Sequence, residues 1–115
     1  MALDYRPMLE AAIYAARVAG GILRADLHRP DGPRGAGHKA DADLEAEEAI
    51  RRILLAACPG FGYLGEETGS QPAAAGEPHL WLVDPNDGTT SYLKGLRGSA
   101  VSIGLLGDGV PVLGV

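Results

Sequence analysis

The chain has 115 residues, of which 46% are hydrophobic and 22% charged, and these values are ordinary for a globular protein. This length supports a single domain, residues 1–115, with a modest core. A formal net charge of −5 at pH 7 argues against the basic surface that binds nucleic acid or an anionic membrane, so we expect neither partner. The one cysteine, Cys58, cannot form a disulfide within the chain, which favours a reducing cytoplasm. We interpret it as a small buried residue at a helix end.

Two helices are predicted in the amino-terminal half. From Tyr5 to about Ala25, apolar residues recur at steps of three and four positions, as they do on one face of a helix. Gly20-Gly21 weakens this helix or marks close packing against a neighbour. A second helix is predicted to begin at Asp41 or Asp43, either of which would be its cap, and to stop at Pro59-Gly60.

At least three strands follow the helices. A short apolar run leads into Glu66-Glu67, Leu80 to Val83 is a buried strand, and Ser99–Leu106 and Val110–Val115 flank a Gly107-Asp108-Gly109 turn. The polar segments "HRPDGPRGAGHKAD" and Ser70 to Pro78 are predicted loops. We therefore expect an α+β fold in which two amino-terminal helices pack on an antiparallel sheet.

The last predicted strand stops at Val115 with no following element. A strand needs a paired neighbour and a covered face, so the pattern indicates a truncated chain. We expect the open edge and uncovered face of its sheet to promote self-association, for example as a homodimer.

The stretch "WLVDPNDGTT" places unusual polar chemistry at the end of the buried strand. Asp84 and Asp87 follow within a Pro/Gly turn, and carboxylates are the oxygen ligands that Mg²⁺ prefers. Gly88 permits close backbone approach, while Thr89 and Thr90 supply amide and hydroxyl groups for a phosphate. For such a cluster alone, a solvated turn would be the more common explanation.

A second acidic segment favours the metal site over the solvated turn. Glu66-Glu67 ends the preceding apolar run in the same way, which would place its carboxylates at the end of a neighbouring strand. Clustered acids repel one another, and a bound cation relieves that repulsion. Standing alone, the pair would equally suit an exposed turn between Gly65 and Gly69.

With both segments considered, the chain resembles the inositol monophosphatase family of magnesium-dependent, lithium-sensitive phosphatases. That family has Gly-Glu-Glu at one strand end, here Gly65-Glu66-Glu67, and then Trp, two apolar residues and Asp-Pro-x-Asp-Gly-Thr-Thr, here Trp81 to Thr90. The segments "ADLEAEEAIRRIL", "SAVSIGLL" and "GVPVLGV" look like its second helix and next two strands. The resemblance implies the first half of the family's layered αβαβα sugar-phosphatase fold. It also implies a phosphomonoesterase that hydrolyses a small sugar or polyol phosphate with metal-activated water.

The resemblance assigns the metal ligands. Glu66 and Asp84 would hold a first Mg²⁺ together with the main-chain carbonyl of Asn86, and Asp84 and Asp87 would contribute to a second. Asp84 would thereby take a direct part in catalysis.

The resemblance also assigns the phosphate site and the acid–base chemistry. Gly88 and Thr89 would bind the substrate phosphate through backbone N–H groups, with Thr90 beside them. Thr89, oriented by an acid at the start of the second helix, would position and deprotonate the attacking water. Asp43 is the candidate for that acid and Asp41 its rival, because the loop before this helix is several residues shorter than the family pattern.

Other features leave the activity and the substrate open. The family's later Trp-Asp-x-Ala-(Ala/Gly)-Gly motif, whose Asp completes the second metal site, does not occur here, and the family's full chain is roughly twice this length. The alternative is therefore a catalytically inactive, truncated remnant that binds metal or is merely structural. Inositol phosphates, other sugar phosphates, histidinol phosphate and phosphonucleotides all remain candidate substrates. His38 and His79 are given no role. The segment Gly95 to Gly98, with Lys94 and Arg97, is interpreted as a solvated basic turn in preference to a phosphate contact.

Overall fold

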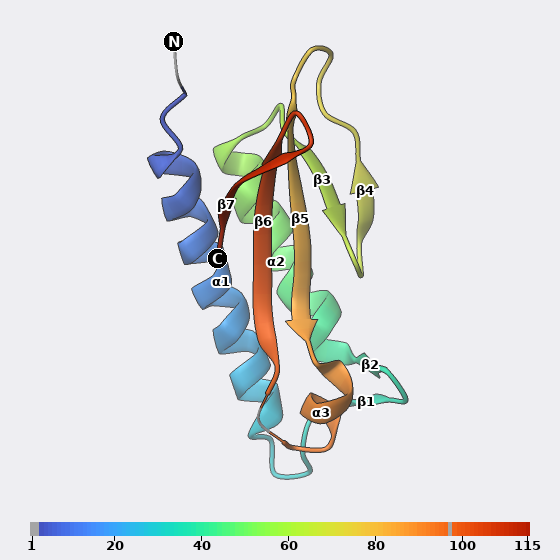
Figure 1. The fold of residues 1–115 in the computed structure, drawn as a ribbon. Helices are drawn as coiled ribbons and strands as arrows, with labels where there is room; N and C mark the ends of the chain where they lie inside the picture. Colours follow the sequence, from blue (N-terminus) through green and yellow to red (C-terminus); the bar gives the residue numbers. More distant parts are fainter. Residues whose placement is uncertain (1–2, 97) are drawn as a thin grey trace.

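The computed structural model describes residues 3–96 and 98–115. Its helices are α1 (Arg6–Leu27), α2 (Asp41–Ala57) and the short α3 (Thr89–Leu93). Its strands are β1 (Gly35–Ala36), β2 (Lys39–Ala40), β3 (Gly62–Gly65), β4 (Gly69–Gln71), β5 (His79–Asp87), β6 (Ala100–Gly107) and β7 (Val110–Gly114). The two long helices lie side by side against the sheet, and α3 lies beyond the end of β5 (Figure 1). The predicted α+β class is confirmed.

Small residues line the covered sides of both long helices. Ala15 and Ala19 of α1 and Ala42 and Ala46 of α2 are fully buried, so the helix backbones can approach closely. The first helix runs without a break through Gly20-Gly21, which the sequence marked as a weak point. Burial of the apolar stripe stabilises these helices more than residue propensity does.

The start of α2 differs from the prediction, because neither predicted aspartate is its cap. The N-cap is Ala40, and Asp41 and Asp43 both lie in the first turn, where carboxylates interact favourably with the helix dipole. The backbone N–H of Asp41 lies in the first turn and has no partner within the helix. It donates instead to the carbonyl of Arg34 at 3.0 Å. The carbonyl of Arg34, in the chain before the helix, therefore supplies one acceptor that a capping side chain would otherwise supply.

The main sheet has the strand order β4-β3-β5-β6-β7. The expected antiparallel pairing holds at β3–β4, β5–β6 and β6–β7, but β3 and β5 are parallel. The parallel pair arises because β4 and the loop at residues 72–78 return the chain to the end of the sheet at which β3 begins. As a result, β3 and β5 both run toward the same edge and deliver their following residues there.

The hairpin between β6 and β7 is confirmed, with Asp108 and Gly109 at its turn. Both have positive φ, 52° and 78°, which a two-residue turn of the type favoured in hairpins requires. Two predictions of loops were wrong in part, because β4 and the β1–β2 hairpin lie in the polar segments. Their short sequences show no alternation of apolar and polar residues, so the sequence pattern did not predict these strands.

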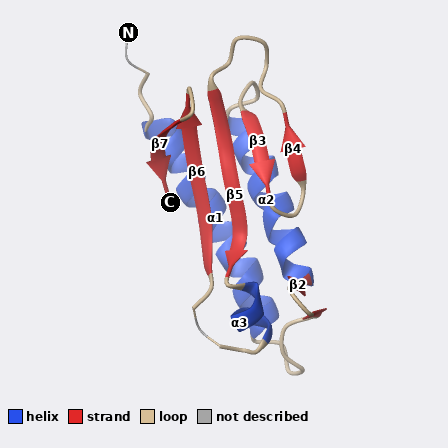
Figure 2. Ribbon diagram, turned by 45° about the vertical axis from the view of Figure 1, so that its right-hand side comes forward, coloured by secondary structure: helices blue, strands red, loops and turns tan. Residues whose placement is uncertain are grey.

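Helices α1 and α2 cover one face of the sheet (Figure 2). Tyr63, Trp81 and Leu105 are register partners that point to this face, and all three are fully buried. Their neighbours Leu64 and Leu82 point to the opposite face, which we call the outer face, and Leu64 is 46% exposed. Asp84 lies on the outer face too, two residues beyond Leu82.

Three smaller findings concern membrane spans and single positions. In the part of the chain that the structure describes, no helix combines the length and apolar character needed to cross a bilayer. Cys58 ends α2 as predicted but is only half-buried, and burial raises the pKa of its thiol. Lys94 is exposed at the end of α3, whereas Arg97 lies outside the described residues.

Candidate functional site

The parallel pairing of β3 and β5 brings the two acidic segments together. Gly65 is the register partner of Val83, so the next residues, Glu66 and Asp84, lie side by side at one edge of the sheet. The backbone N–H of Glu66 donates to the carbonyl of Val83 at 3.2 Å and ties the turn after β3 to β5. The sequence predicted neighbouring strands, and the structure makes them direct partners.

Electrostatics at this edge is dominated by carboxylates. The negative charge of Asp84 is the largest cause that raises the pKa of Glu66 above its ordinary value. Burial, followed by the charges of Asp43 and Glu47, raises the pKa of Glu67 as well. Like charges held this close disfavour ionisation, and a cation between them would reverse that effect.

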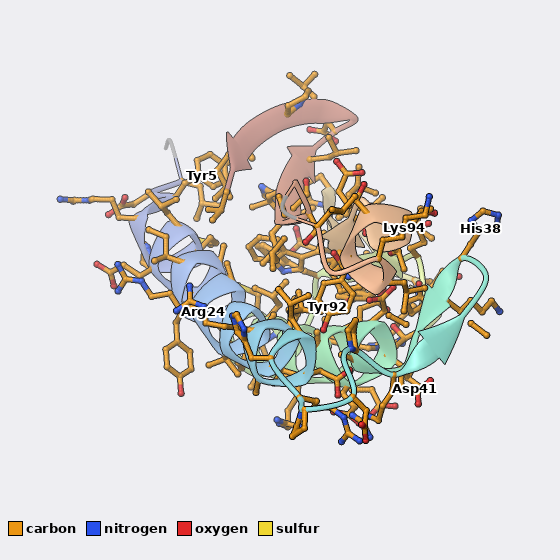
Figure 3. The ribbon with its side chains drawn as sticks, turned by 90° about the horizontal axis from the view of Figure 1, so that it is seen from below. Tyr5, Arg24, His38, Asp41, Tyr92 and Lys94 are labelled. Atoms are coloured by element: carbon orange, nitrogen blue, oxygen red, sulfur yellow. The ribbon has the colours of Figure 1, made fainter. Side chains whose placement is uncertain are left out.

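Asp43 is the acid that contacts Thr89. It is 1% exposed, and its Oδ2 accepts a hydrogen bond from the Thr89 hydroxyl at 2.9 Å. Its Oδ1 accepts from the side-chain amide of Asn86 at 2.9 Å, so both carboxylate oxygens are fixed. Asp41, in contrast, is exposed and lies at the edge of the molecule (Figure 3). Of the two predicted candidates, the structure therefore brings only Asp43 to the threonine.

Asn86 does more than the sequence suggested. Only its carbonyl was expected to act, yet its side chain is 3% exposed and connects β5 to Asp43. Its carbonyl oxygen lies 2.8 Å from the Thr89 hydroxyl, which has one hydrogen to share between this oxygen and Asp43. Among the described residues nothing donates a hydrogen bond to the buried Oδ1 of Asn86.

The turn between β5 and α3 depends on a glycine. Gly88 has φ of 96°, and a Cβ there would lie 2.9 Å from the carbonyl oxygen of Gly98. Thr89 and Thr90 follow as the first residues of α3, and Tyr92 anchors that helix through a 2.7 Å hydrogen bond from its hydroxyl to the carbonyl of Leu23. The predicted phosphate-binding residues are therefore held on an anchored segment.

Two histidines that were given no role have definite contacts. His38 lies at the tip of the β1–β2 hairpin (Figure 3). Its Nδ1 is 3.0 Å from the hydroxyl of Thr90. His79 is buried, stacks on Phe61 at 4.7 Å between ring centroids, and is bound through Nε2 by Tyr5 and through Nδ1 by Glu77. The contacts of His79 are structural, while His38 borders the candidate site.

Sequence reasoning missed Glu47 altogether. Its side chain is fully buried in α2, and its carboxylate accepts hydrogen bonds from the backbone of Glu67 and Thr68. The signal that could have found it is its position, four residues after Asp43 and therefore on the same helix face.

The residues at the sheet edge fit a hard divalent cation. Glu66 and Asp84 border a shallow hollow of about 350 Å³ on the outer face, and the ligand atoms that they offer are carboxylate oxygens. Asp87 follows a β-bulge and is exposed. Within residues 3–96 and 98–115, no three His, Cys, Asp or Glu side chains converge into a complete cage. The described chain thus supplies a carboxylate pair that suits Mg²⁺ with water or substrate oxygens completing its shell.

Comparisons with known proteins identify the family and the fold of the chain. The chain matches the model of the inositol monophosphatase family over residues 4–115. It is 40% identical over 115 residues to an inositol-1-monophosphatase of Mesorhizobium japonicum, covering 94% of this chain and 42% of that relative. It is 44% identical over 75 residues to a histidinol-phosphatase of Mycobacterium tuberculosis, covering 65% of this chain and 28% of that one. The crystal structure of the extragenic suppressor protein SuhB from Bartonella henselae matches with a TM-score of 0.84 at 34% identity, covering 93% of this chain and 43% of that one.

The chain spans less than half the length of each of these relatives. The family match nevertheless covers almost the whole chain, and the fold agrees with a solved structure over the same extent. The chain therefore belongs to the inositol monophosphatase family and corresponds to its amino-terminal portion.

Proposed function

We propose that this chain is the part of a cytoplasmic, Mg²⁺-dependent phosphomonoesterase that carries the acidic metal ligands and the catalytic threonine. The observation that carries the proposal is the 2.9 Å hydrogen bond from the Thr89 hydroxyl to Asp43. Thr89 follows the end of β5, the same strand end at which Asp84 lies beside Glu66. A hydroxyl that is oriented by a buried carboxylate and lies next to acidic side chains that repel one another suits the activation of water for phosphoryl transfer.

The proposed metal ligands are those at the sheet edge. Glu66, Asp84 and the Asn86 carbonyl would hold one Mg²⁺, and Asp84 with Asp87 would contribute to a second. When bound, Mg²⁺ supplies a water of lowered pKa and neutralises charge on the phosphoryl oxygens. The raised pKa of Glu66 supports this assignment, because a cation at this place would stabilise both carboxylates in their charged form.

The chain's own residues would orient and deprotonate the attacking water. When the Thr89 hydroxyl donates to Asp43, its oxygen lone pairs are free to accept a hydrogen bond from that water. As the water attacks phosphorus, its proton would pass to Thr89 Oγ1 while the Thr89 proton passes to Asp43 Oδ2. The bond from phosphorus to the ester oxygen would break at the same time, and the alcohol would leave with a proton taken from solvent water. Asn86 holds the Asp43 carboxylate in place through the other oxygen, so the transfer needs no rearrangement.

The phosphate would lie against the start of α3. Backbone N–H groups of Gly88 and Thr89 would bind its oxygens, with the Thr90 hydroxyl at the side, and the left-handed backbone of Gly88 permits that close approach. The relatives act by name on inositol and histidinol phosphates, so the proposed substrate class is a small phosphorylated alcohol, with a sugar or polyol preferred.

The test measures phosphate release from inositol 1-phosphate, histidinol phosphate and glycerol 2-phosphate at varied Mg²⁺. We expect release that requires Mg²⁺ and that falls by roughly 100-fold or more in Asp43→Asn and Thr89→Ala, the usual size of a general acid–base contribution. Asp41→Asn is the matched control, because this acid lies in the same helix turn but is exposed, and it should leave release unchanged.

Two other outcomes contradict the proposal. If the chain binds Mg²⁺ through Asp84 but releases no phosphate, the alternative of a metal-binding chain without catalysis replaces it. If Asp41→Asn and Asp43→Asn lower release equally, the assignment of Thr89 and its acid is wrong.

A further inference from the structure

One buried charge on α2 plays no part in the proposed chemistry. Glu47 is fully buried, as Asp43 nearly is, and the spacing of four residues places both on one face of the helix. Asp43 holds the segment after β5, so the same face of α2 could also hold the segment after β3.

The hydrogen bonds that Glu47 accepts come from the turn that follows β3. Its Oε1 accepts from the backbone N–H of Glu67 at 2.8 Å, and its Oε2 accepts from the backbone N–H of Thr68 at 2.6 Å. The Thr68 hydroxyl donates to the same Oε2. A buried carboxylate is costly unless donors compensate it, and here all three donors come from two residues directly after Glu66.

Two neighbours of Glu47 reinforce this arrangement. Gly65 leaves the space that the carboxylate occupies, since a Cβ there would collide with it. Arg51, one turn further along α2, donates from Nη1 to the carbonyl of Thr68 at 2.9 Å and to its hydroxyl at 3.0 Å. The turn at residues 66–68 is therefore fastened to α2 by two side chains.

We propose that Glu47 is a positioning residue for the metal site: by fixing the turn at residues 66–68, it sets where Glu66 lies relative to Asp84. The inference rests on the proposed function, because it concerns the same carboxylate pair. One rigid helix thus places both halves of the site, Asp43 acting on the β5 side and Glu47 on the β3 side.

A positioning role differs from a merely stabilising one in its effect on ion selectivity. Mg²⁺ demands near-ideal octahedral geometry at short distances, whereas Ca²⁺ accepts longer bonds and irregular shells. Displacing Glu66 should therefore weaken the binding of Mg²⁺ more than the binding of Ca²⁺. Loss of groups that orient metal ligands typically costs 10- to 100-fold in affinity.

The test titrates Mg²⁺ and Ca²⁺ separately into the protein by isothermal calorimetry and compares variants. Glu47→Gln replaces one carboxylate oxygen by an NH₂ group, which faces a backbone N–H and cannot accept its hydrogen bond. We therefore expect Mg²⁺ affinity to fall about tenfold or more and the Mg²⁺/Ca²⁺ affinity ratio to fall with it. Thr68→Val removes the hydroxyl that donates to Glu47 and accepts from Arg51 but keeps both backbone donors, so it should shift the ratio in the same direction by a smaller factor. It also keeps the test open if Glu47→Gln does not fold.

Leu54→Ala is the matched control, because Leu54 is fully buried in the same helix and its apolar side chain makes no hydrogen bond to either acidic turn. It should lower the melting temperature and leave the affinity ratio unchanged. An unchanged ratio in both Glu47→Gln and Thr68→Val, with normal Mg²⁺ binding by the wild type, overturns the positioning role alone. Failure of the wild type to bind Mg²⁺ overturns the proposed metal site together with this inference.

Discussion

The space beside Gly65 gives the sharpest stability prediction. A Cβ added there would lie 2.8 Å from Oε1 of Glu47 and closer still to the rest of the carboxylate, whereas carbon contacts are comfortable only at about 3.5–4.0 Å. The carboxylate cannot swing aside freely, because it is fully buried and bound by three donors. Gly65→Ala should therefore break at least one hydrogen bond to a charged acceptor.

Each such bond contributes roughly 1.5–3 kcal/mol, so we expect the free energy of unfolding to fall by about 2–4 kcal/mol. With an unfolding entropy of about 2.1 cal/mol/K per residue, this loss lowers the melting temperature by roughly 8–16 °C. Gly104→Ala is the control, since Gly104 also lies in a strand but has no atom within 4 Å of its added Cβ. That change should be neutral or stabilise by about 0.5–1 kcal/mol.

Urea unfolding followed by the fluorescence of Trp81 measures both variants, because Trp81 is the single tryptophan and is fully buried. If Gly65→Ala and Gly104→Ala unfold at the same urea concentration, the Glu47 carboxylate does not occupy the space that the structure gives it.

Three further predictions concern the site and the sheet. Gly88→Ala should lower the free energy of unfolding by about 1–3 kcal/mol in a urea titration, because φ is 96° and the Cβ would meet Gly98; an unchanged midpoint contradicts this. The folded-state pKa of Glu66 is raised, so the stability it contributes is full below its unfolded pKa and is lost as pH rises through the folded pKa. Glu66→Gln, without divalent ions, should therefore gain stability relative to the wild type between pH 4 and pH 7, and an equal difference at both pH values refutes the assigned cause. The exposed Leu64 on the outer face predicts self-association, seen as a sedimentation coefficient that rises with concentration and returns to the monomer value in Leu64→Lys.

The two acidic segments and their places at strand ends could be predicted because they are local in the sequence. Strand ends, turn residues and clustered acids all appear in "WLVDPNDGTT", and Glu66 follows the preceding apolar run in the same way. The direct pairing of the two strands was only partly predictable, because it depends on β4. The residues of β4, Gly69 to Gln71, have no apolar pattern. The sequence therefore did not predict that the chain reverses through β4, which is what makes β3 and β5 parallel.

The groups that hold the site together were harder to predict. Glu45, Glu47 and Glu48 look alike in the sequence, and only the helix register shows that Glu47 points inward. Its partners lie twenty and twenty-one residues away, and two of its three donors are backbone amides, which no residue type in the sequence reveals. The side chain of Asn86 was missed for a similar reason, since its contact with Asp43 spans 43 residues and leaves no local signal.

The central claim, that the ends of β3 and β5 form a divalent-cation site, is tested most directly by titrating Mg²⁺ into ¹⁵N-labelled protein and following each amide. The claim predicts saturable shifts centred on Glu66 and on Asp84 to Asp87, weakened at least tenfold in Asp84→Asn. Asp108→Asn, in the β6–β7 turn, should leave them unchanged. Shifts of equal affinity in Asp84→Asn and the wild type, or shifts spread over surface acids with no centre at these residues, would contradict the claim.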